Sequence, residues 1–319
     1  MWGNALDHVL AVEVVTADGV VRQASESENG DLFWGLRGAG GSLGIVTRFT
    51  VKTHEAPRDK VQVSYELSVG SQSQMASVFN DWQALAGDAG LDRRFSTAFV
   101  AHPLGALVTG TFYGTQAEYN ESGIPARLPG GGGGGGGGGG LGVRLGGSLG
   151  RVVSQGERVA LELSAMPTFF YGKSLALREQ DLLGRESVEA LFGYMDRQRP
   201  PALWTVIFNS EGGAVADTPA EATAYPHRDK VIMYQSYVAG LVRLPAAARA
   251  WAQGVHERVQ SGAPNASSTY AGYIDTALSR REAQERYWGA QLPRLRAIKR
   301  AWDPADVFRN PQGVEPADG

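Results

Sequence analysis

The feature that most constrains the fold is a glycine cluster that leads directly into a β-branched run. The cluster consists of Gly38, Gly40, Gly41 and Gly44. Because glycine has no Cβ, this backbone can adopt positive φ and approach a bulky ligand closely. A Rossmann fingerprint must open a helix, whereas Ile45–Val51 reads as a strand, and Leu43 stands where its third glycine would fall. The cluster therefore indicates either another kind of cofactor loop or an ordinary tight turn.

Charge and residue usage exclude several classes of protein. The formal net charge of the 319 residues is −3, which gives no electrostatic footprint for nucleic acid. The chain has no cysteine, which excludes disulfides, thiolate metal sites and a cysteine nucleophile. Its five histidines show no metal-ligand spacing, so no metal site is predicted. No apolar run reaches the roughly 18 residues of a membrane-spanning helix.

The order of the predicted elements favours an α+β fold over a doubly wound sheet. Leu10–Thr16 and Val20–Ala24 flank an Asp-Gly turn and predict a hairpin, followed by a helix around Ala24–Leu36. Hairpin-length connections recur further along the chain, as expected for an antiparallel sheet. The remaining strands are predicted at 61–67, 95–100, 106–113, 203–209 and 231–239, and the helices at 74–86, 187–198 and 245–261.

The last predicted helix has a clear beginning and end. Ser279 and Glu282 form a capping-box pattern, and apolar residues recur at helical spacing up to Trp302. Asp303 and the following proline end the helix. Pro293 lies inside the pattern and is expected to kink it.

A run of eleven glycines, Gly130–Gly140, interrupts the middle of the chain. A glycine homopolymer buries no surface, so it forms no packed structure of its own. Either a natural flexible insertion or a fault in the sequence explains the run. Residues 129–155 are therefore set aside as unreliable.

Several blocks together resemble one family of flavin enzymes. They are 6–9, 25–29, 31–34, 37–47, 212–213, 224–229, 270–273, 287–288 and 303–310. The chain resembles the berberine-bridge-enzyme-like FAD-linked oxidases of the vanillyl-alcohol oxidase superfamily, and within it the fungal glucooligosaccharide and chitooligosaccharide oxidases. The resemblance covers nearly the whole chain apart from the glycine run.

The resemblance implies the C-terminal part of a PCMH-type FAD-binding domain and a substrate domain whose antiparallel sheet is backed by helices. Residues 1–57 would form the second half of the FAD-binding domain, 58–269 the substrate domain, and 270–319 the segment that returns to the FAD-binding domain. The segment that cradles the pyrophosphate and carries the flavin-bonding histidine would lie upstream of Met1. The chain is thus expected to be truncated at its N-terminus.

The implied activity is that of an FAD-dependent oxidase. Such an enzyme oxidises an alcohol, here the anomeric hydroxyl of a sugar, to a lactone and reduces O2 to H2O2. Two other interpretations stay open: an oxidase of a non-carbohydrate secondary metabolite, and a non-catalytic fragment without a flavin site. A secreted parent protein that acts as a monomer is expected, and the sequons at Asn120 and Asn265 are compatible with secretion.

Catalytic and substrate-binding residues follow from the same resemblance. Tyr273 matches the family's base, and Tyr270 would line the sugar site. A phenol has a pKa near 10, so it needs a partner to act as a base at neutral pH. Where the oligosaccharide oxidases use an aspartate, this chain has Asn209, and Ile207 replaces a sugar-binding glutamine. Glu211 could substitute for the aspartate because it would share the strand face of Asn209.

Other matching positions concern substrate and flavin contacts. Gln235 would face the sugar site. His227 and Arg228 are interpreted as structural residues. The residues expected to contact the flavin are Gly38, Gly40, Gly41, Gly44, Ile45, Val46 and Asn310.

Overall fold

The computed structural model of the chain describes residues 1–67, 72, 75–128, 142–143, 168–241 and 243–318. Gly130–Gly140 and all of 129–155 except Gly142 and Val143 lie outside these residues. The chain divides into two compact units. Unit 1 comprises Pro57–Glu211 and Lys230–Ala266 together with Met1, and unit 2 comprises Trp2–Ala56, Gly212–Asp229 and Ser267–Gly319.

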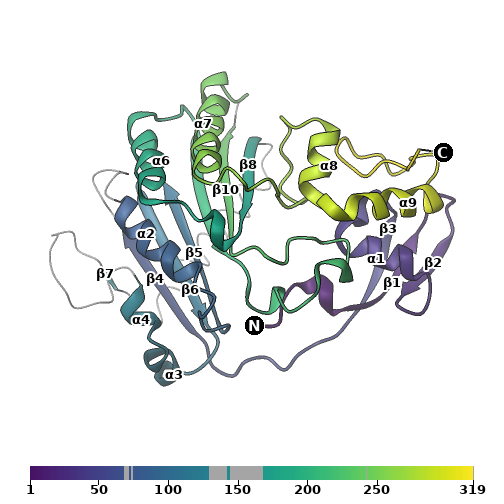
Figure 1. The fold of residues 1–319 in the computed structure, drawn as a ribbon, viewed down its shortest axis with the longest axis horizontal. Helices are drawn as coiled ribbons and strands as arrows, with labels where there is room; N and C mark the ends of the chain where they lie inside the picture. Colours follow the sequence, from purple (N-terminus) through teal and green to yellow (C-terminus); the bar gives the residue numbers. More distant parts are fainter. Residues whose placement is uncertain (68–71, 73–74, 129–141, 144–167, 242, 319) are drawn as a thin grey trace. The chain divides into compact units, whose positions relative to one another are not determined.

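Unit 1 is built on an antiparallel sheet of seven strands, in the order β7-β4-β6-β5-β9-β10-β8 (Figure 1). Residues alternate between the two faces of each strand, and in β5 every second residue is buried. The strands are β4 (Val61–Leu67), β5 (Phe95–His102), β6 (Gly105–Phe112), β7 (Gly142–Val143), β8 (Phe169–Leu177), β9 (Leu203–Ser210) and β10 (Ile232–Gly240).

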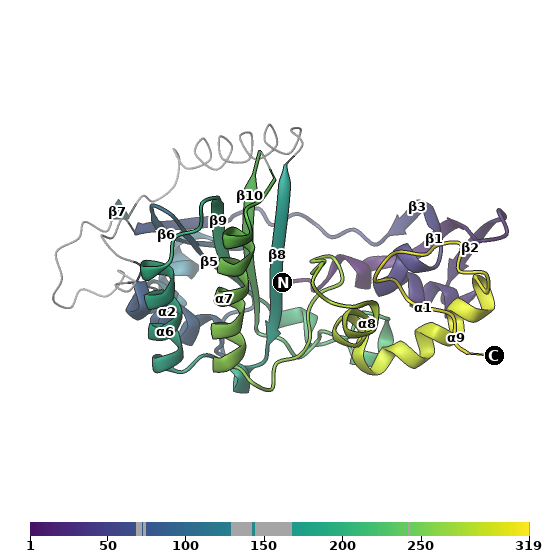
Figure 2. The same cartoon turned by 90° about the horizontal axis from the view of Figure 1, so that it is seen from above.

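Three helices cover one face of this sheet: α2 (Met75–Ala86), α6 (Arg185–Arg197) and α7 (Ala246–Gly262) (Figure 2). Phe79 and Trp82 of α2 pack on Phe208 of β9, and the ring centroids of Phe79 and Phe208 are 4.6 Å apart. The short helices α3 (Gln116–Glu121) and α4 (Ile124–Arg127) follow β6. The opposite face carries polar side chains of the strands, among them Gln62, Ser96 and Asn209.

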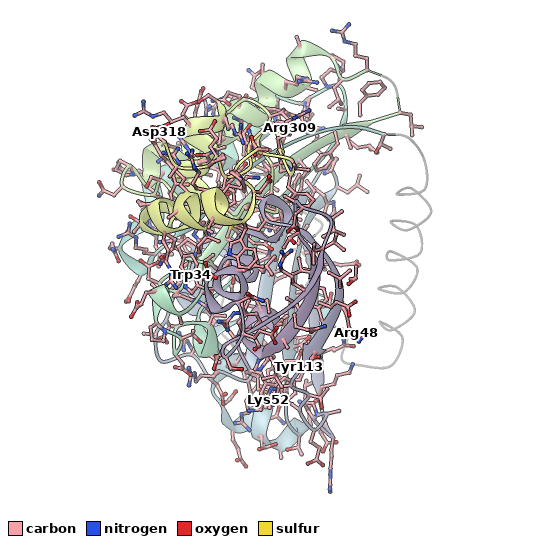
Figure 3. All side chains as sticks on the ribbon, turned by 90° about the vertical axis from the view of Figure 1, so that its right-hand side faces the viewer. Trp34, Arg48, Lys52, Tyr113, Arg309 and Asp318 are labelled. Atoms are coloured by element: carbon pink, nitrogen blue, oxygen red, sulfur yellow. The ribbon has the colours of Figure 1, made fainter. Side chains whose placement is uncertain are left out.

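Unit 2 contains a three-stranded antiparallel sheet in the order β2-β1-β3. Its elements are β1 (Val9–Val15), β2 (Val21–Ser25), α1 (Gly30–Ala39), β3 (Ile45–Val51), α8 (Arg280–Trp288) and α9 (Leu292–Trp302). Val12 and Val14 share a buried cluster with Leu295 of α9. Gly35 of α1 leaves room for Leu43, because a Cβ there would lie 2.5 Å from the Leu43 side chain. Arg48 projects from β3 to the surface (Figure 3).

The antiparallel α+β architecture confirms the predicted fold class, and β3 and β4 have the predicted bounds. Strand β8 was not predicted. The first helix begins at Gly30 rather than near Ala24. Residues 25–29 form a turn instead, in which the amide of Ser25 donates to the carbonyl of Glu28 and Asn29 has a φ of 50°.

The expected kink at Pro293 is wrong in its position. The C-terminal helix breaks four residues earlier at Gly289, whose φ is 46°. A second helix, α9, then begins at Leu292, which places Pro293 in its first turn. A proline is tolerated there because the first amides of a helix have no intrahelical acceptor.

The predicted division of the chain differs from the observed units at 212–229. The predicted substrate domain, 58–269, includes these residues, but they pack in unit 2. Both guanidinium nitrogens of Arg228 contact the carboxylate of Asp7, at 2.6 and 2.7 Å. The indole of Trp34 donates to the carbonyl of Glu221 at 2.8 Å. These contacts hold the segment, and they support a structural role for Arg228.

In the described part of the chain, no helix has the length and apolar character needed to cross a membrane.

Candidate functional site

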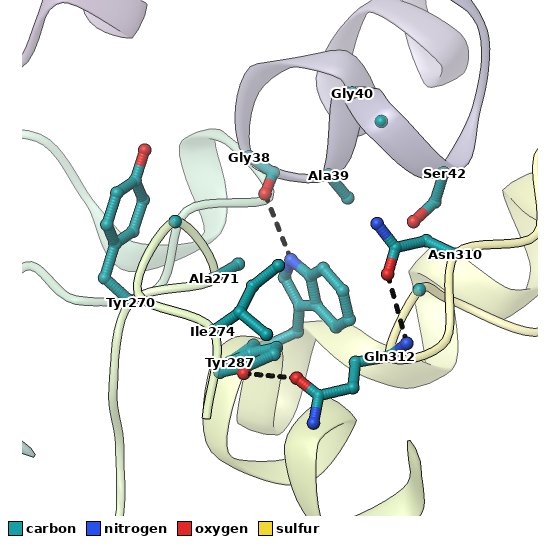
Figure 4. Close-up of a pocket in the computed structure, with 14 residues that line it drawn as sticks. Gly38, Ala39, Gly40, Ser42, Tyr270, Ala271, Ile274, Tyr287, Asn310 and Gln312 are labelled. Atoms are coloured by element: carbon teal, nitrogen blue, oxygen red, sulfur yellow. Dashed lines mark hydrogen bonds between the residues drawn. The ribbon is translucent and has the colours of Figure 1, made fainter. Parts of the chain in front are cut away.

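Unit 2 contains a cavity of about 200 Å³ lined by glycines, aromatic rings and amides, called here the glycine–aromatic cavity (Figure 4). Three segments that are far apart in sequence contribute to it: the glycine cluster, the start of the C-terminal segment, and the tail after α9. The lining residues are Gly38, Ala39, Gly40, Gly41, Ser42, Tyr270, Ala271, Gly272, Ile274, Tyr287, Trp288, Asn310, Gln312 and Gly313.

The glycine cluster forms one wall, and its glycines have different roles. Gly38 has a φ of 151°, and a Cβ there would lie 2.9 Å from the carbonyl oxygen of Ala224. Its own carbonyl accepts a 3.1 Å hydrogen bond from the indole of Trp288. Gly40 and Gly41 have open space where a Cβ would be. Gly38 is therefore required by the protein's own packing, whereas Gly40 and Gly41 leave room on the cavity side.

The tail forms an adjoining wall through a chain of hydrogen bonds. The hydroxyl of Tyr287 donates to Oε1 of Gln312 at 2.7 Å (Figure 4). The backbone N–H of Gln312 donates to Oδ1 of Asn310 at 3.1 Å. Nε2 of Gln312 donates to the carbonyl of Asp275 at 2.7 Å. The hydroxyl of Ser42 accepts from the amide of Val314 at 3.1 Å. These bonds fix the tail against both the glycine cluster and α8.

A buried ionic group contacts the glycine cluster at the carbonyl of Ser42. Nζ of Lys299 contacts the carbonyl of Ser42 at 2.8 Å, Oδ2 of Asp303 at 2.6 Å and Oδ1 of Asp306 at 2.9 Å. Burial would raise the pKa of Asp303, but hydrogen bonds from Lys299 and from the amides of Phe308 and Val307 outweigh it and lower that pKa. The site therefore keeps Asp303 ionised.

Aromatic side chains surround one side of the glycine–aromatic cavity. Tyr270 is 39% exposed and packs edge-to-face on Tyr273, with ring centroids 5.4 Å apart. Tyr225 packs against the other side of Tyr270 at 6.0 Å. The amide of Tyr273 donates to the carbonyl of Tyr270 at 2.9 Å, which closes a tight turn. Tyr270 lines the cavity, and Tyr273 is half-buried beside it.

Three residues expected to contact the flavin do not line this cavity. A Cβ at Gly44 would lie 2.6 Å from Val14, so β1 requires a glycine there. Ile45 is 59% exposed on β3, and Val46 packs against the core of unit 2. Gly38, Gly40, Gly41 and Asn310 do line the cavity. Flavin contact by Gly44, Ile45 and Val46 stays a prediction.

The predicted substrate residues of unit 1 lie on the sheet face opposite the helices. Ile207 on β9 is the cross-strand partner of Gln235 on β10. Gln235 is buried, and its Oε1 accepts a 2.5 Å hydrogen bond from the hydroxyl of Tyr237. Asn209 lies two residues further along β9 on the same face.

A second cavity, of about 380 Å³, lies on this face and is called here the sheet cavity. Asn209 and Glu211 both line it, although β9 ends at Ser210. The amide of Glu211 donates to the carbonyl of Val231 at 2.8 Å, which keeps the residue at the end of the sheet. Burial raises the pKa of Glu211 to about 7. Its carboxyl group therefore changes charge near neutral pH.

The structure thus brings the predicted residues together in two sets. Tyr270, Gly38, Gly40, Gly41 and Asn310 line the glycine–aromatic cavity of unit 2. Asn209 and Glu211 share the sheet cavity of unit 1, while Ile207 and Gln235 form a pair outside its lining.

Sequence reasoning missed Ile274, Gln312 and Gly313, which line the glycine–aromatic cavity. Four further lining residues are identified from sequence only as parts of matching blocks: Ser42, Ala271, Tyr287 and Trp288. Nothing in the local pattern marks Gln312 as a buried cross-link. Ser42 stands between Gly41 and Leu43, and its position in the glycine cluster was the available signal.

The glycine–aromatic cavity fits part of an FAD molecule. The open space at Gly40 and Gly41 and the flanking aromatic rings suit a flat ring system. Nδ2 of Asn310 has no partner among the described residues, so it remains available as a donor. None of the described lining residues is charged, so the cavity has no cation for a pyrophosphate. Its volume also lies below the roughly 300–1,000 Å³ of typical ligand pockets. We therefore assign it to a neutral part of the cofactor.

Within the described ranges, no group of three or more histidine and acidic side chains is placed to hold a metal ion.

Comparisons with known proteins agree on one type of enzyme. The family model for berberine and berberine-like proteins matches residues 269–315. The FAD-linked oxidoreductase sorD of Penicillium rubens is 32% identical over 99% of this chain and 66% of its own length. The glucooligosaccharide oxidase of Sarocladium strictum is 28% identical over 98% of this chain and 64% of its own. The chain thus spans slightly less than two thirds of these curated relatives.

A solved structure gives the same result. The xylooligosaccharide oxidase from Myceliophthora thermophila, in complex with xylobiose, superimposes with a TM-score of 0.80 at 27% identity. The match covers 98% of this chain and 67% of the solved chain. The similarity therefore extends over both units.

Proposed function

Because the chain belongs to the berberine-bridge-enzyme-like FAD-linked oxidoreductases, we propose that the whole protein oxidises a hydroxyl group of a carbohydrate with FAD as its cofactor. The observation that carries the proposal is the placement of Tyr270 and Tyr273 beside a cavity lined by the glycine cluster. Several relatives are named as oligosaccharide oxidases, which supports a sugar substrate. The finer proposal is oxidation of the anomeric hydroxyl to a lactone, with O2 reduced to H2O2 by a monomer.

The residues of unit 2 would hold the cofactor. Gly40 and Gly41 offer backbone without side chains, and Asn310 offers an amide donor. FAD, when bound, supplies the acceptor for the hydride that leaves the substrate carbon. Trp288 and Tyr287 anchor the glycine cluster and the tail, so both walls stay in place.

The protein's own chemistry is removal of the hydroxyl proton. We assign that role to Tyr273, whose ring oxygen must be in its phenolate form to accept the hydroxyl proton as the carbon–hydrogen bond breaks. Tyr270 holds the ring of Tyr273 in an edge-to-face contact and presents its own hydroxyl to the sugar. In unit 1, Asn209 hydrogen-bonds a substrate hydroxyl but cannot take its proton. Glu211 supplies the ionisable group of the sheet cavity.

The test uses the purified chain after incubation with FAD and gel filtration. We expect retained visible flavin absorption and H2O2 release with xylobiose but not with an aromatic alcohol. Tyr273→Phe should keep the flavin and lower the rate by about 100-fold or more. Tyr113→Phe, whose side chain lines neither cavity, serves as the matched control. If Tyr273→Phe turns over as fast as the wild type, Tyr273 is not the base. If the wild-type chain loses its flavin on gel filtration, this chain alone does not hold the cofactor.

Secretion of the whole protein is a further part of the proposal. Asn120 and Asn265, the two sequon asparagines, are both exposed. We expect glycans at both positions when the protein is secreted by a yeast host, detected as mass shifts that disappear in Asn120→Gln and Asn265→Gln. Unmodified secreted protein would contradict this expectation.

A further inference from the structure

Two histidines of unit 2 lie side by side, although 46 positions separate them in the sequence. Nε2 of His54 and Nδ1 of His8 are 3.2 Å apart. Strand pairing brings them together: the amide of Lys52, just after β3, donates to the carbonyl of His8, just before β1, at 2.7 Å. His54 follows Lys52 by two residues. The end of β3 therefore carries one imidazole to the start of β1, where the other is found.

A hydrogen bond to the backbone orients the ring of His8. Its Nε2 lies 2.8 Å from the carbonyl oxygen of Trp2. Because a carbonyl oxygen only accepts, this nitrogen carries the hydrogen, and the lone pair of a neutral His8 is on Nδ1. That lone pair faces Nε2 of His54. A backbone carbonyl bound to the other ring nitrogen is the arrangement that orients metal-binding imidazoles and makes them more basic.

The ring of His54 contacts two other rings. The indole of Trp2 stacks on it with ring centroids 5.1 Å apart and an angle of 14° between the planes, and His8 meets it edge-on at 4.6 Å. Loss of water around the ring lowers the pKa of His54, and the positive charges of His8 and Lys52 lower it further. His54 is therefore neutral at pH 7. Its Nε2 offers a lone pair once the hydrogen moves to Nδ1 through solvent.

The distance between the two nitrogens fits two ligands of one metal ion. Imidazole nitrogens that lie about 2.0–2.1 Å from a metal are about 2.9 Å apart at a right angle and about 3.3 Å apart in a tetrahedron. The observed 3.2 Å lies between these values. The carboxylate of Asp7, next to His8 in sequence, is already bound to Arg228 at 2.6 Å. The two imidazoles are thus the protein ligands, and water fills the other positions.

We propose that His8 and His54 together bind a divalent transition-metal ion, with Cu²⁺ as the preferred ion. Two neutral imidazoles select this class, because Mg²⁺ and Ca²⁺ prefer oxygen ligands and Cu²⁺ has the highest affinity among the divalent first-row ions. Neither histidine lines the glycine–aromatic cavity or the sheet cavity, so the inference does not depend on FAD or on a sugar. The ion would connect the start of β1 to the segment that follows β3.

The test is a titration of the full chain with Cu²⁺, followed by tryptophan fluorescence and calorimetry. The protein carries no histidine tag and is freed of metal with EDTA, which is then removed. One ion should bind per chain, and paramagnetic Cu²⁺ on His54 should quench the stacked indole of Trp2. His8→Ala and His54→Ala should each weaken binding by about 100-fold or more, since outer-shell partners alone are worth about 10- to 100-fold in affinity. His102→Ala removes a histidine of unit 1 and should leave the affinity unchanged.

Further measurements distinguish this site from a general affinity for copper. Zn²⁺ should compete with Cu²⁺ for the site but bind more weakly, and Mg²⁺ should not compete. Trp2→Phe should remove the quenched signal and keep the affinity measured by calorimetry. Lys52→Met removes a nearby positive charge and should tighten Cu²⁺ binding roughly 2- to 5-fold.

The side chain of His54 is exposed, so His54→Ala should fold, and thermal unfolding without metal checks this. Equal Cu²⁺ affinity of the wild type, His8→Ala and His54→Ala would overturn the site, as would a wild type that binds no Cu²⁺. Loss of binding in both histidine variants, with His102→Ala unchanged, would establish it.

Discussion

Nζ of Lys299 lies 2.6 Å from Oδ2 of Asp303, and both side chains are completely buried. The same ammonium group donates to the carbonyl of Ser42 in the glycine cluster at 2.8 Å. The Lys299 ammonium group, held by Asp303, therefore joins the last turn of α9 to a wall of the glycine–aromatic cavity. A buried charge without its partner destabilises the folded state. A substitution at Lys299 or Asp303 should therefore also disturb the cavity wall at Ser42.

Lys299→Met tests this coupling. Removing the ammonium leaves Asp303 buried without its cation, so the free energy of unfolding should fall by about 3–5 kcal/mol. Urea denaturation monitored by tryptophan fluorescence measures the change. Lys52→Met removes an exposed lysine of unit 2 and should change stability little. Equal stability of the two variants would contradict the coupling.

Acid should weaken the same pair. The pKa of Asp303 is lowered in the folded protein from its ordinary value of 3.8. Its contribution to stability is therefore present above that ordinary value and is lost as the pH falls through the lower, folded-state pKa. Thermal unfolding from roughly pH 5 to pH 2 should show this loss in the wild type. Asp303→Asn should be less stable than the wild type at pH 5, and this difference should shrink in acid. A constant difference would argue against the pair.

Alanine substitutions at Gly38 and Gly41 test the different roles of these two glycines. Gly38→Ala places a Cβ 2.5 Å from the carbonyl carbon of Ala224 at a φ of 151°, so it should destabilise the protein by about 1–3 kcal/mol. Gly41→Ala adds the same atom in open space and should leave the unfolding midpoint nearly unchanged. FAD titration then shows whether Gly41→Ala weakens cofactor binding. Equal unfolding midpoints for the two variants would refute the distinction.

Glu211 should make stability depend on pH near neutrality. Its folded-state pKa of about 7 lies above its ordinary value of 4.5. The folded state therefore binds the proton more tightly, and stability should fall as the pH rises from about 4.5 to about 7. Glu211→Gln should remove this component, so its stability relative to wild type rises over that range. Parallel pH profiles of the two proteins, followed by thermal unfolding, would contradict the shift.

Much of the fold was predictable because its signals are local. Strands β3 and β4 have the predicted bounds, because a β-branched run after the glycine cluster defines β3 and alternating apolar residues define β4. The capping box at Ser279 was also predicted, and its side chain accepts from the amide of Glu282. Strand β8 was missed. Seven of its nine residues are buried, so it lacks the alternation of a half-exposed strand.

The candidate site was predictable only in part because its contacts are long-range. The glycine cluster and Asn310 were identified from sequence, but the reason for a glycine at position 38 is the backbone of Ala224. Gln312 cross-links Tyr287 and Asp275, and no local pattern encodes those partners. The sheet cavity depends on the register between β4, β6 and β5, which only strand pairing defines.

Unit 2 is assembled from three separate stretches of chain, and this has a consequence for synthesis on the ribosome. The residues joined by the bond between Lys299 and Ser42 are 257 positions apart. The first segment of unit 2 must therefore wait, without its partners, while unit 1 emerges and folds. During that interval the apolar faces of β1 and α1 are open to chaperones. Release of the last fifty or so residues from the exit tunnel then completes the unit.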